Sequence, residues 1–331
     1  MKSHAAHSTA ELLRREFKQA EGRWVSGEAL SRKLQMSRTA VWKHVCTLKS
    51  EGYRIASSPR KGYMLEGIPD LLLPQEVREG LQTSRIGQGE IRYRRRMEST
   101  NLEAKALAAA GAAEGTLVIA EEQTAGKGRR GRHWFSPPGA GIYLSLILRP
   151  DIQPQEAPRF ALLTAAAVAA AIREVTRLEA TIKWPNDLLA GGRKLGGILT
   201  EIGMDMDRVE YMVIGLGINV NLERKDFPPE LEELATSIQA EAGRFFPRLP
   251  LVRRILESFE ETYAAYRQQG FAPILKRWQS YAEMMGRRIA VASLGQTFTG
   301  EVMDFDADGF LVLREENRGP MRFFSGDVSF V

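Results

Sequence analysis

The sequence predicts an α/β (α+β) protein with an N-terminal winged helix-turn-helix, a central mixed sheet with helices, and a small C-terminal β-barrel. Three observations support this prediction. Residues 1–66 are basic and mainly helical in pattern, residues 89–281 mix buried-strand runs with helices, and residues 282–331 hold short alternating strands separated by glycines. Residues 67–88 are interpreted as a linker.

Composition is that of a globular protein. The chain has 331 residues, of which 26% are charged and 44% hydrophobic, enough for two or three domains with a sizeable core. The single cysteine, Cys46, excludes an internal disulfide framework and fits a reducing cytosol. The longest apolar stretch, residues 160–172, is too short to span a bilayer, and no secretory signal is evident. We therefore expect a cytoplasmic protein with no membrane partner.

Charge is unevenly distributed along the chain. Residues 1–66 hold 13 Lys or Arg and 6 Glu, a net charge of +7, so the remaining residues carry −2 of the chain's +5. A basic N-terminal part on a slightly acidic body is typical of a domain that binds a polyanion.

The N-terminal part has the pattern of a winged helix-turn-helix. Helices are predicted over residues 10–20, over residues 28–34 after an N-cap at Ser26, and after an N-cap at Ser37, followed by a hairpin over residues 53–65. In this motif the third helix enters the major groove and the wing lies near the backbone. A helical protein-interaction or capping module is the alternative, and the positive charge favours DNA. The candidate DNA-binding residues lie on the outer face of the third helix and in the wing: Ser37, Arg38, Thr39, Trp42, Lys43, Arg60 and Lys61.

The rest of the chain is predicted to alternate helices and strands. A short helix over residues 74–81 lies in the linker, and a helical region covers residues 251–281. Further helices are expected at residues 101–110 and 160–176. Strands are predicted where β-branched or alternating apolar runs occur, at residues 91–95, 116–120, 141–148, 180–184, 188–201 as a hairpin, 208–215, 288–292, 297–303, 310–313 and 321–324.

A glycine-rich cationic segment follows the strand at residues 116–120. Residues 126–132 read Gly-Lys-Gly-Arg-Arg-Gly-Arg, which combines three glycines with four cations. Glycine lets the backbone approach a ligand, and arginine recognises phosphate or carboxylate with two parallel hydrogen bonds. The segment therefore favours a site for a phosphorylated or acidic ligand. A solvated basic loop and a nucleic-acid patch remain the alternatives.

Other polar residues admit a structural reading as well as a functional one. Ser99 and Thr100 suit capping of the following helix and also hydrogen bonding to a small polar ligand. The Gly-x-Gly at residues 215–217 does not open a helix, so a dinucleotide fold is not favoured. His133 is interpreted as a loop residue, and no metal-ligand spacing is present.

Five motifs occur in one order along the chain: Ser99-Thr-Asn101, Gln123 with the 126–132 segment, Lys183-Trp-Pro-Asn-Asp187, Lys194-Leu-Gly-Gly197 and Gly215-Leu-Gly-Ile-Asn219. Together they resemble the biotin–protein ligase family, and the N-terminal module makes the chain similar to the bifunctional bacterial members that repress the biotin operon. Lys127 departs from the arginine more usual in the family loop, which keeps the charge and loses the planar fork.

The resemblance implies a two-step ligation. Biotin and ATP, with magnesium, give biotinyl-adenylate, and a lysine of the biotin carboxyl carrier protein of acetyl-CoA carboxylase then attacks it. It also implies operator DNA as a partner, biotinyl-adenylate as corepressor and a homodimer when liganded.

Site residues follow from the same resemblance. The implied catalytic residues are Lys194, Arg129, Lys183 and Asp187. The implied biotin-binding residues are Ser99, Thr100, Asn101, Gln123, Gly126, Lys127, Gly128, Arg129, Lys194 and Gly197. The implied ATP-binding residues are Arg129, Arg132, Trp134, Lys183, Asn186 and Asn219, and no protein metal ligand is expected. Asp187 is a candidate to orient Lys194 or the incoming lysine, or else a residue that forms the turn.

Two other functions compete with this reading. The first is a non-enzymatic regulator that uses the same fold to sense biotin, against which the intact set of cations argues. The second is a lipoate ligase of related fold, whose glycine-rich motif differs from residues 126–132. Biotin-dependent pyrophosphate release tests the first, and competition between biotin and lipoate tests the second.

Overall fold

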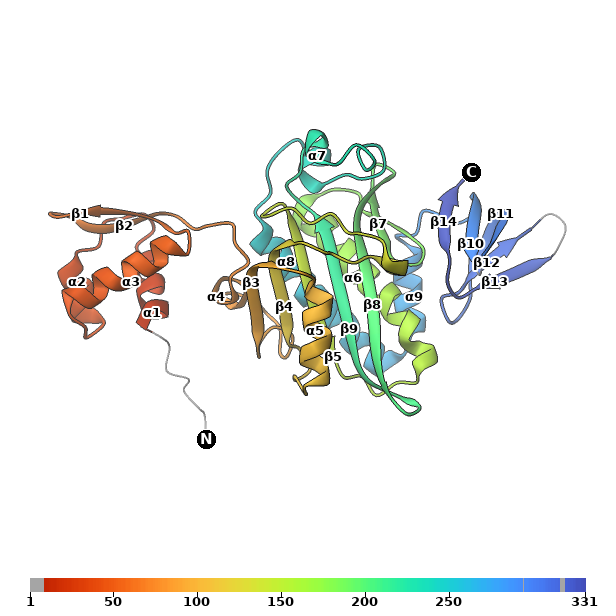
Figure 1. Ribbon diagram of the computed structural model, residues 1–331, viewed down its shortest axis with the longest axis horizontal. Helices are drawn as coiled ribbons and strands as arrows, with labels where there is room; N and C mark the ends of the chain where they lie inside the picture. The colour runs from red at the N-terminus through yellow and green to blue at the C-terminus, as the bar shows by residue number, and fades with distance from the viewer. Residues whose placement is uncertain (1–8, 294, 316–318) are drawn as a thin grey trace. The chain divides into compact units, whose positions relative to one another are not determined.

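The computed structural model describes residues 9–293, 295–315 and 319–331. The chain divides into two compact units, Met1–Asp70 and Leu71–Val331. The first is a helical module with a hairpin, and the second holds a mixed sheet with helices and an antiparallel C-terminal sheet (Figure 1). The predicted fold class is therefore confirmed.

The helices of the first unit are α1 (Thr9–Gln19), α2 (Gly27–Lys33) and α3 (Arg38–Ser50), and serines cap the second and third of them. The Ser26 hydroxyl accepts a hydrogen bond from the Ala29 N–H at 3.0 Å, and Ser37 accepts one from Ala40 at 3.1 Å. Each bond satisfies a donor that the first helical turn would otherwise leave unpaired. The core of the unit is apolar and includes Leu13, Phe17, Leu30, Val41, Val45 and Leu48.

The wing is an antiparallel hairpin of β1 (Arg54–Ser58) and β2 (Gly62–Gly67). Gly62 has a φ of +93°, and a Cβ there would lie 2.2 Å from the Val25 carbonyl oxygen. Only glycine fits this close approach, which lets Val25 and Tyr63 pair as an isolated bridge. The hairpin is thereby joined to the segment that leads into α2.

The second unit is built on a mixed sheet. Its strands are β3 (Ile91–Met97), β4 (Leu117–Gln123), β5 (Gly141–Leu148), β6 (Thr181–Lys183), β7 (Asp187–Ala190), β8 (Arg193–Asp205) and β9 (Arg208–Asn219). Their order in the sheet is β3-β4-β5-β9-β8-β7-β6, in which β3 and β4 are parallel and the other neighbours antiparallel. Gly191 and Gly192, both with positive φ, turn β7 into β8.

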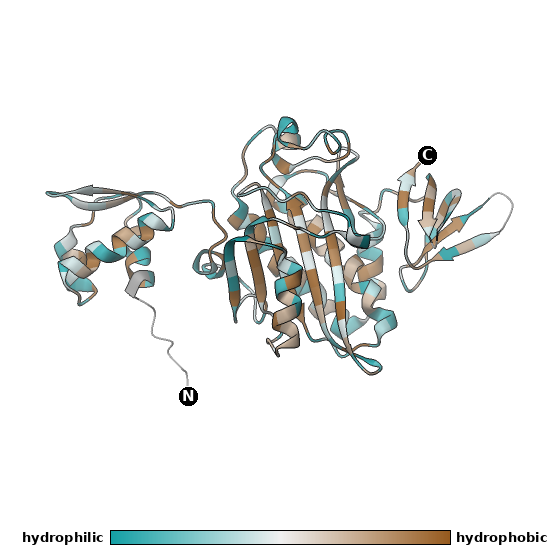
Figure 2. Cartoon of the chain, viewed as in Figure 1, coloured by the Kyte–Doolittle hydropathy of each residue, from teal (hydrophilic) through white to brown (hydrophobic). Residues whose placement is uncertain are grey.

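Helices cover both faces of this sheet. The unit has the helices α4 (Pro74–Arg78), α5 (Thr100–Ala109), α6 (Ala157–Thr176), α7 (Ile238–Ala242), α8 (Arg248–Gln269) and α9 (Ala272–Gln279), of which α5 covers one face of the sheet and α6 and α8 cover the other. Alternate residues of one strand face opposite sides: Val118 packs with α5, whereas Leu117 and Ile119 belong to the large core with α6 and α8. Figure 1 shows α5 on the other side of the sheet from α6 and α8, and Figure 2 shows apolar residues along the central strands.

Strand β9 corrects the prediction that this strand ends at Gly215, because it continues to Asn219. Its glycines leave room for side chains packed on the strand. A Cβ on Gly215 would lie 2.1 Å from Asn101 Oδ1, and one on Gly217 would lie 2.4 Å from Trp134 Nε1. Glycine at these positions therefore marks close packing beside a strand and not a chain turn.

Smaller corrections concern element ends and two missed elements. Helix α4 ends at Arg78 instead of residue 81, and α6 begins at Ala157, ahead of the predicted residue 160. The short helix α7 was not predicted. Proline at the first turn suits the start of α6, which the apolar pattern alone placed too late.

The C-terminal residues form an antiparallel, barrel-like sheet. Its strands are β10 (Arg288–Ser293), β11 (Gln296–Phe305), β12 (Leu311–Arg314), β13 (Pro320–Phe323) and β14 (Asp327–Phe330). The strand order is β13-β12-β11-β10-β14. Strand β14 was not predicted, because its four residues give too little alternation to stand out from the preceding loop. It pairs with β10 and brings residues 326–328 against the central part of the unit.

Candidate active site

A pocket of about 360 Å³ lies in the second unit and gathers motifs that are far apart in the sequence. It is lined by the start of α5, the basic loop (residues 126–132), the β6–β7 turn, β8, β9, a loop after β9 and the start of β14. Most of the sequence-predicted site residues line it: Ser99, Thr100, Asn101, Gln123, Lys127, Gly128, Arg129, Arg132, Trp134, Lys183, Asn186, Asp187, Lys194, Gly197 and Asn219. Its assignment as the binding site stays a prediction.

Gly126 lies outside this lining. A Cβ there would be 2.6 Å from the Trp134 carbonyl oxygen and 2.8 Å from Ser136 Oγ. The Gly126 carbonyl accepts the Trp134 N–H at 2.8 Å, so this glycine closes the base of the basic loop. Its observed contacts are structural.

A polar network forms the floor of the pocket at the start of α5. Gln123 Oε1 accepts hydrogen bonds from the Thr100 N–H at 2.8 Å and from the Thr100 hydroxyl at 3.1 Å. The Gln123 amide nitrogen then donates to Ser136 Oγ at 3.0 Å. The Ser99 hydroxyl accepts a hydrogen bond from the Leu102 N–H at 3.5 Å, so Ser99 caps α5 as its position before the helix suggested. The floor is thus fixed before any ligand arrives.

Asn101 is the hub of this network beneath the floor. Its amide nitrogen donates to Glu201 Oε2 at 2.9 Å and to the Leu199 carbonyl at 3.3 Å, and its oxygen accepts from Ser145 at 2.6 Å. Asn101 is 4% exposed. Because both amide protons are engaged by protein groups, Asn101 orients its neighbours more than it offers a donor to a ligand.

Glu201 anchors the outer end of the network. Partial burial raises the pKa of Glu201, but hydrogen bonds from Lys105 and Asn101 outweigh that effect and leave its pKa below the ordinary value. Lys105 Nζ lies 2.7 Å from Glu201 Oε1. Residues 105 and 201 were not predicted as site residues, because nothing in their local sequence distinguishes them from a surface ion pair.

The basic loop leaves β4 and folds back on itself. A backbone bridge pairs Lys127 with His133, and the Gly128 N–H donates to the Arg132 carbonyl at 2.7 Å. Between them lies a single 3₁₀ turn, η1 (Arg129–Gly131), with Arg130 in the left-handed region at φ 55°. A non-glycine residue there carries a strain of about 1 kcal/mol or more, so outside contacts must hold it.

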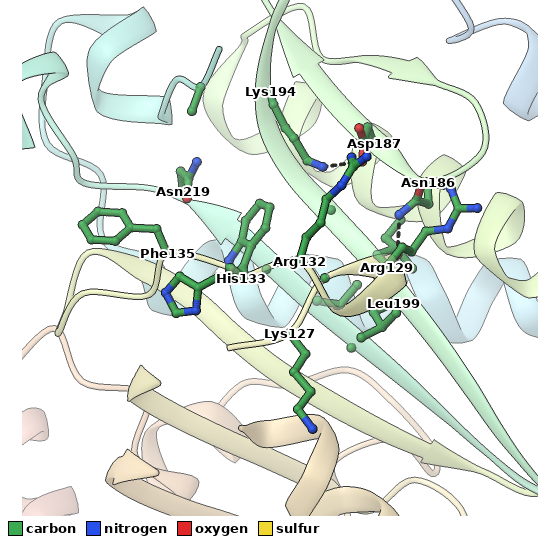
Figure 3. A pocket seen from close by; sticks show the side chains of 18 of the residues that line it. Lys127, Arg129, Arg132, His133, Phe135, Asn186, Asp187, Lys194, Leu199 and Asn219 are labelled. Carbon is green, nitrogen blue, oxygen red and sulfur yellow. Dashed lines mark hydrogen bonds and ion pairs between the residues drawn. The ribbon is translucent and has the colours of Figure 1, made fainter. Parts of the chain in front are cut away.

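Lys194 and Asp187 form the central ion pair of the site. Lys194 Nζ lies 2.6 Å from Asp187 Oδ1, and Lys183 Nζ lies 3.7 Å from Asp187 Oδ2. Figure 3 shows the Lys194 and Asp187 side chains pointing at one another, while Lys127 points away from them. Asp187 is therefore more than a turn residue, since it holds two lysines at one position.

Neighbouring backbone fixes Lys194 in place. The Lys194 N–H donates to the Leu234 carbonyl at 2.8 Å, and the Thr236 N–H donates to the Lys194 carbonyl at 2.9 Å. Lys194 Nζ also lies 5.5 Å from the Trp134 ring centroid, a cation–π distance. The loop at residues 231–236 thus supports a lysine that the sequence places 40 residues earlier.

Arg129 is the most enclosed cation of the basic loop. Its Nη1 donates to Asn186 Oδ1 at 3.1 Å, drawn in Figure 3, and to the Gly326 carbonyl at 3.3 Å. Burial lowers the pKa of Arg129, and the charges of Asp327 and Asp187 oppose that effect. A desolvated arginine of this kind interacts strongly with an incoming anion.

Trp134 and Asn219 line the side of the pocket beside β9. The Trp134 ring packs against Gly217, and its buried Nε1 has no hydrogen-bond partner within the described residues. Asn219 donates to the Thr236 carbonyl at 3.0 Å. Trp134 therefore contributes its ring to the pocket wall, and the Asn219 amide tethers the 231–236 loop.

Sequence reasoning missed two segments that line the pocket. One is an apolar patch of Phe135, Phe227, Leu231, Leu234 and Ala235. The other is the start of β14, with Gly326, Asp327 and Val328. The apolar residues at 227, 231 and 234, spaced four and three apart, were a usable signal, but the approach of residues 326–328 depends on tertiary packing that no local pattern indicates.

A second surface of interest lies in the first unit. The candidate DNA-binding residues Ser37, Arg38, Thr39, Trp42, Lys43, Arg60 and Lys61 are all exposed. Trp42 is 55% exposed on α3, and Lys61 Nζ lies 5.7 Å from the Trp24 ring centroid. Ser37 also caps α3. The face is polar and basic, as a helix that binds DNA requires, and these roles stay predictions.

The described part of the chain offers neither a metal-binding cluster of side chains nor a membrane-spanning helix. Within it, no cluster of three or more His, Cys, Asp or Glu side chains could hold a metal ion. No described helix is long and apolar enough to cross a bilayer. The expectation that magnesium accompanies ATP stays a prediction.

Three family models match the chain. Residues 93–219 match the biotin/lipoate A/B protein ligase family, residues 9–64 match an HTH domain, and residues 285–331 match the biotin protein ligase C-terminal domain.

Curated relatives match over most of the chain. It is 44% identical over 312 residues to the bifunctional ligase/repressor BirA of Bacillus subtilis, covering 94% of this chain and 95% of that protein. It is 32% identical over 304 residues to the protein of the same name from Escherichia coli, covering 90% of each. A solved biotin protein ligase from Aquifex aeolicus, in complex with biotin and ATP, aligns with a TM-score of 0.63 at 24% identity over 72% of this chain and 97% of that chain, which is a likeness of fold.

Proposed function

The chain belongs to the biotin/lipoate A/B protein ligase family, and from that premise we propose that it is an ATP-dependent biotin–protein ligase that also represses transcription in response to biotin. The observation that carries the proposal is the gathering of the motif cations around one pocket. Lys183 and Lys194 meet at Asp187, and Arg129 hydrogen-bonds to the adjacent Asn186. The similarity to bifunctional ligase/repressors over 94% of the chain supports both functions.

The first step joins biotin to the nucleotide. A carboxylate oxygen of biotin attacks the α-phosphorus of ATP, the α–β phosphoanhydride bond breaks, and pyrophosphate leaves. Two negatively charged reactants must meet, so fixed cations lower the barrier by positioning them and stabilising the developing charge. We assign these roles to Lys194, Arg129 and Lys183, with Arg132 contacting the nucleotide.

The second step transfers biotin to a carrier protein. A carrier lysine amine attacks the carbonyl carbon of biotinyl-adenylate, and AMP leaves with the electron pair of the broken C–O bond. Asp187 lies 2.6 Å from Lys194 Nζ, which supports a role in orienting Lys194 or the incoming amine. The carrier is the carboxyl carrier protein of acetyl-CoA carboxylase in this proposal.

The remaining lining supports a division of the pocket between biotin and nucleotide. The polar floor of Ser99, Thr100 and Gln123 suits a compact polar head group, and Trp134 with the apolar patch suits a planar base. Magnesium, when bound with ATP, neutralises part of the triphosphate charge. The described residues hold no carboxylate cluster for it, so the phosphates and water would supply most of its ligands.

In this proposal, ligand binding in the second unit regulates DNA binding by the first unit through dimerisation. One winged helix-turn-helix reads a short half-site, so binding of a palindromic operator calls for a homodimer. Biotinyl-adenylate would order the basic loop and favour dimerisation, and carrier protein would compete for the liganded monomer. The coupling must be reciprocal, so operator DNA should tighten adenylate binding by the same factor.

The proposal is tested by incubating purified protein with ATP, biotin and a carrier domain, and detecting biotin on the carrier lysine. A carrier with that lysine changed to arginine is the matched control. Equilibrium competition between biotin and lipoate identifies the acyl group. Labelling of the wild-type carrier alone, with biotin preferred, is expected. Binding of biotin with no pyrophosphate released would instead indicate a non-enzymatic sensor, and preference for lipoate would indicate a lipoate ligase.

The regulatory part has its own test. Sedimentation with and without biotin plus ATP should show a dimer only when both are present, and operator DNA should bind more tightly in the same condition. Equal assembly and equal operator affinity in both conditions would leave a ligase with an attached DNA module and no switch.

A further inference from the structure

Asp327 is an acidic side chain on the wall of a pocket otherwise rich in cations. It is the first residue of β14, and its backbone is paired with Ala292 of β10. Its carboxylate oxygen Oδ2 lies 3.2 Å from Arg130 Nη1 and 2.5 Å from Arg132 Nη2. One oxygen of the C-terminal sheet therefore holds two arginines of the basic loop.

The C-terminal sheet and the residue before β14 contact all three arginines of the basic loop, Arg129, Arg130 and Arg132. Arg129 donates to the Gly326 carbonyl at 3.3 Å, and Arg130 donates to the Ala292 carbonyl at 3.5 Å as well as pairing with Asp327. Arg130 has φ 55°, so its backbone needs outside support to remain there. The contacts of the Arg130 side chain with Asp327 of β14 and Ala292 of β10 provide this support. The pairing of β10 with β14 fixes the positions of both residues.

We propose that Asp327 is a positioning residue of the ligase, which holds Arg130 in the loop turn and preorganises Arg132 at the pocket wall before substrate binds. A guanidinium has five N–H donors, so Arg132 can pair with Asp327 and still present donors to a phosphate in the pocket. A loop that Asp327 already restrains in part loses less entropy when the ligand completes its ordering, and it releases the bound intermediate more slowly. This role rests on the proposed ligase function for its effect on the reaction.

The size of the effect follows from exposure. Arg130 and Arg132 side chains are 45% and 70% exposed, and that of Asp327 is 24% exposed. Ion pairs in such settings change an equilibrium by a modest factor, about two- to fivefold. The expected consequence is a looser loop and faster ligand release in Asp327→Asn, with the fold retained because asparagine has nearly the same shape.

Asp308→Asn is the matched control. Asp308 lies in the turn between β11 and β12 of the C-terminal sheet, and its Oδ1 lies 2.8 Å from Arg159 Nη2 on α6. Its loss weakens attachment of the same sheet to the central part of the unit without touching the basic loop. A role for Asp327 in attachment alone would make both variants behave alike.

The first measurement uses the ligand-free full chain and limited trypsin digestion, following cleavage after Lys127 and Arg129. Asp327→Asn should be cut about two- to fivefold faster than wild type, and Asp308→Asn at the wild-type rate. In a background carrying Arg130→Gln and Arg132→Gln, Asp327→Asn should add nothing. Equal cleavage of Asp327→Asn and wild type, or equal acceleration by Asp308→Asn, would overturn the proposal.

The second measurement follows the reaction. Asp327→Asn should raise KM for ATP and speed release of biotinyl-adenylate, each by about two- to fivefold, while kcat changes less. Unchanged release despite faster loop cleavage would overturn the effect on ligand. Because the digestion requires no substrate, it decides the loop contact even if no biotin-dependent pyrophosphate release is found, and that second outcome would overturn the ligase function separately.

Discussion

At the residue scale, we expect Lys194 to contribute more to the rate of biotin activation than any other side chain of the pocket. Its ammonium lies 2.6 Å from Asp187 and is braced by backbone bonds to residues 234 and 236. We expect Lys194→Ala to slow biotin-dependent pyrophosphate release by about 10²–10³, because a preorganised cation at a developing charge contributes several kcal/mol. The exposed Lys276 on α9 is the control, and Lys276→Ala should keep the wild-type rate. A wild-type rate in Lys194→Ala would show that another lysine serves the reaction.

Arg129 is expected to govern how long the intermediate stays bound. Its guanidinium is partly buried between Asn186 and Gly326, where one charge-assisted hydrogen bond to a phosphate contributes about 1.5–3 kcal/mol. Arg129→Gly should therefore speed release of biotinyl-adenylate by roughly ten- to a hundredfold in a chase experiment. Arg177→Gly changes an exposed arginine at the end of α6 and should have no effect on release. Identical release rates in the two variants would remove Arg129 from the site.

The motifs identified the chemical residues well because each is a short run of unusual residue types. They could not show how those residues divide between ligand and support. Asn101 belongs to the first motif, yet its amide is engaged by Leu199, Glu201 and Ser145. Asp327 carries no motif, because its importance arises only from the distance to Arg130 and Arg132.

At the scale of elements, the joint between α8 and the loop before β3 gives a pH prediction. Glu260 of α8 accepts backbone N–H bonds from Ser84, Arg85 at 2.8 Å and Ile86 at 3.0 Å. Partial burial raises the pKa of Glu260, but these bonds outweigh it and leave its pKa below the ordinary 4.5. A depressed native pKa gives stability that is complete above the unfolded pKa and lost as pH falls through the native value.

Glu260→Gln should accordingly lower the free energy of unfolding at pH 7 by about 1–3 kcal/mol, since a neutral amide accepts weaker bonds than a carboxylate. The difference from wild type should shrink as the pH falls below 4.5. Urea unfolding at pH 7 and at lower pH measures both, with exposed Glu232→Gln as the control. A difference that stays constant with pH would contradict the charge argument.

Periodicity predicted the long elements and failed at the short ones. The helix α6 and strand β5 are strongly apolar over many residues, so their existence was clear from sequence. Strand β14 and helix α7 have four and five residues, which is too few for a pattern, and tertiary pairing decides their conformation. Strand β9 was cut short because its glycines resemble a turn, whereas they accommodate Asn101 and Trp134.

At the scale of the whole molecule, the division of the chain predicts separable functions. The predicted chemical residues all lie beyond residue 98, within the unit Leu71–Val331, and the basic helix-turn-helix lies within Met1–Asp70. Deleting residues 1–66 should abolish operator binding and leave biotin-dependent pyrophosphate release measurable. Electrophoretic mobility shift and pyrophosphate assays on the same preparation check both expectations. Sequence-specific DNA binding by the truncated protein would contradict the assignment of the first unit.

The charge of each part fits these separate partners. Residues 1–66 carry +7 and suit the phosphate backbone of DNA, whose binding should weaken steeply as salt is raised. The four cations at residues 127–132 offset acidic residues elsewhere in the second unit, and three of them line the pocket. Sequence composition alone revealed the positive charge of residues 1–66. Only the fold shows that cations from residues 127–132 gather at a pocket.

The most direct test of the account is pyrophosphate release from ATP by the purified full chain, measured with biotin, without it and with lipoate in its place. We predict release that depends on biotin, is not supported by lipoate, and falls by about 10²–10³ in Lys194→Ala. Release that is independent of biotin, or none at all from folded protein that binds biotin, would contradict the conclusion that this pocket activates biotin.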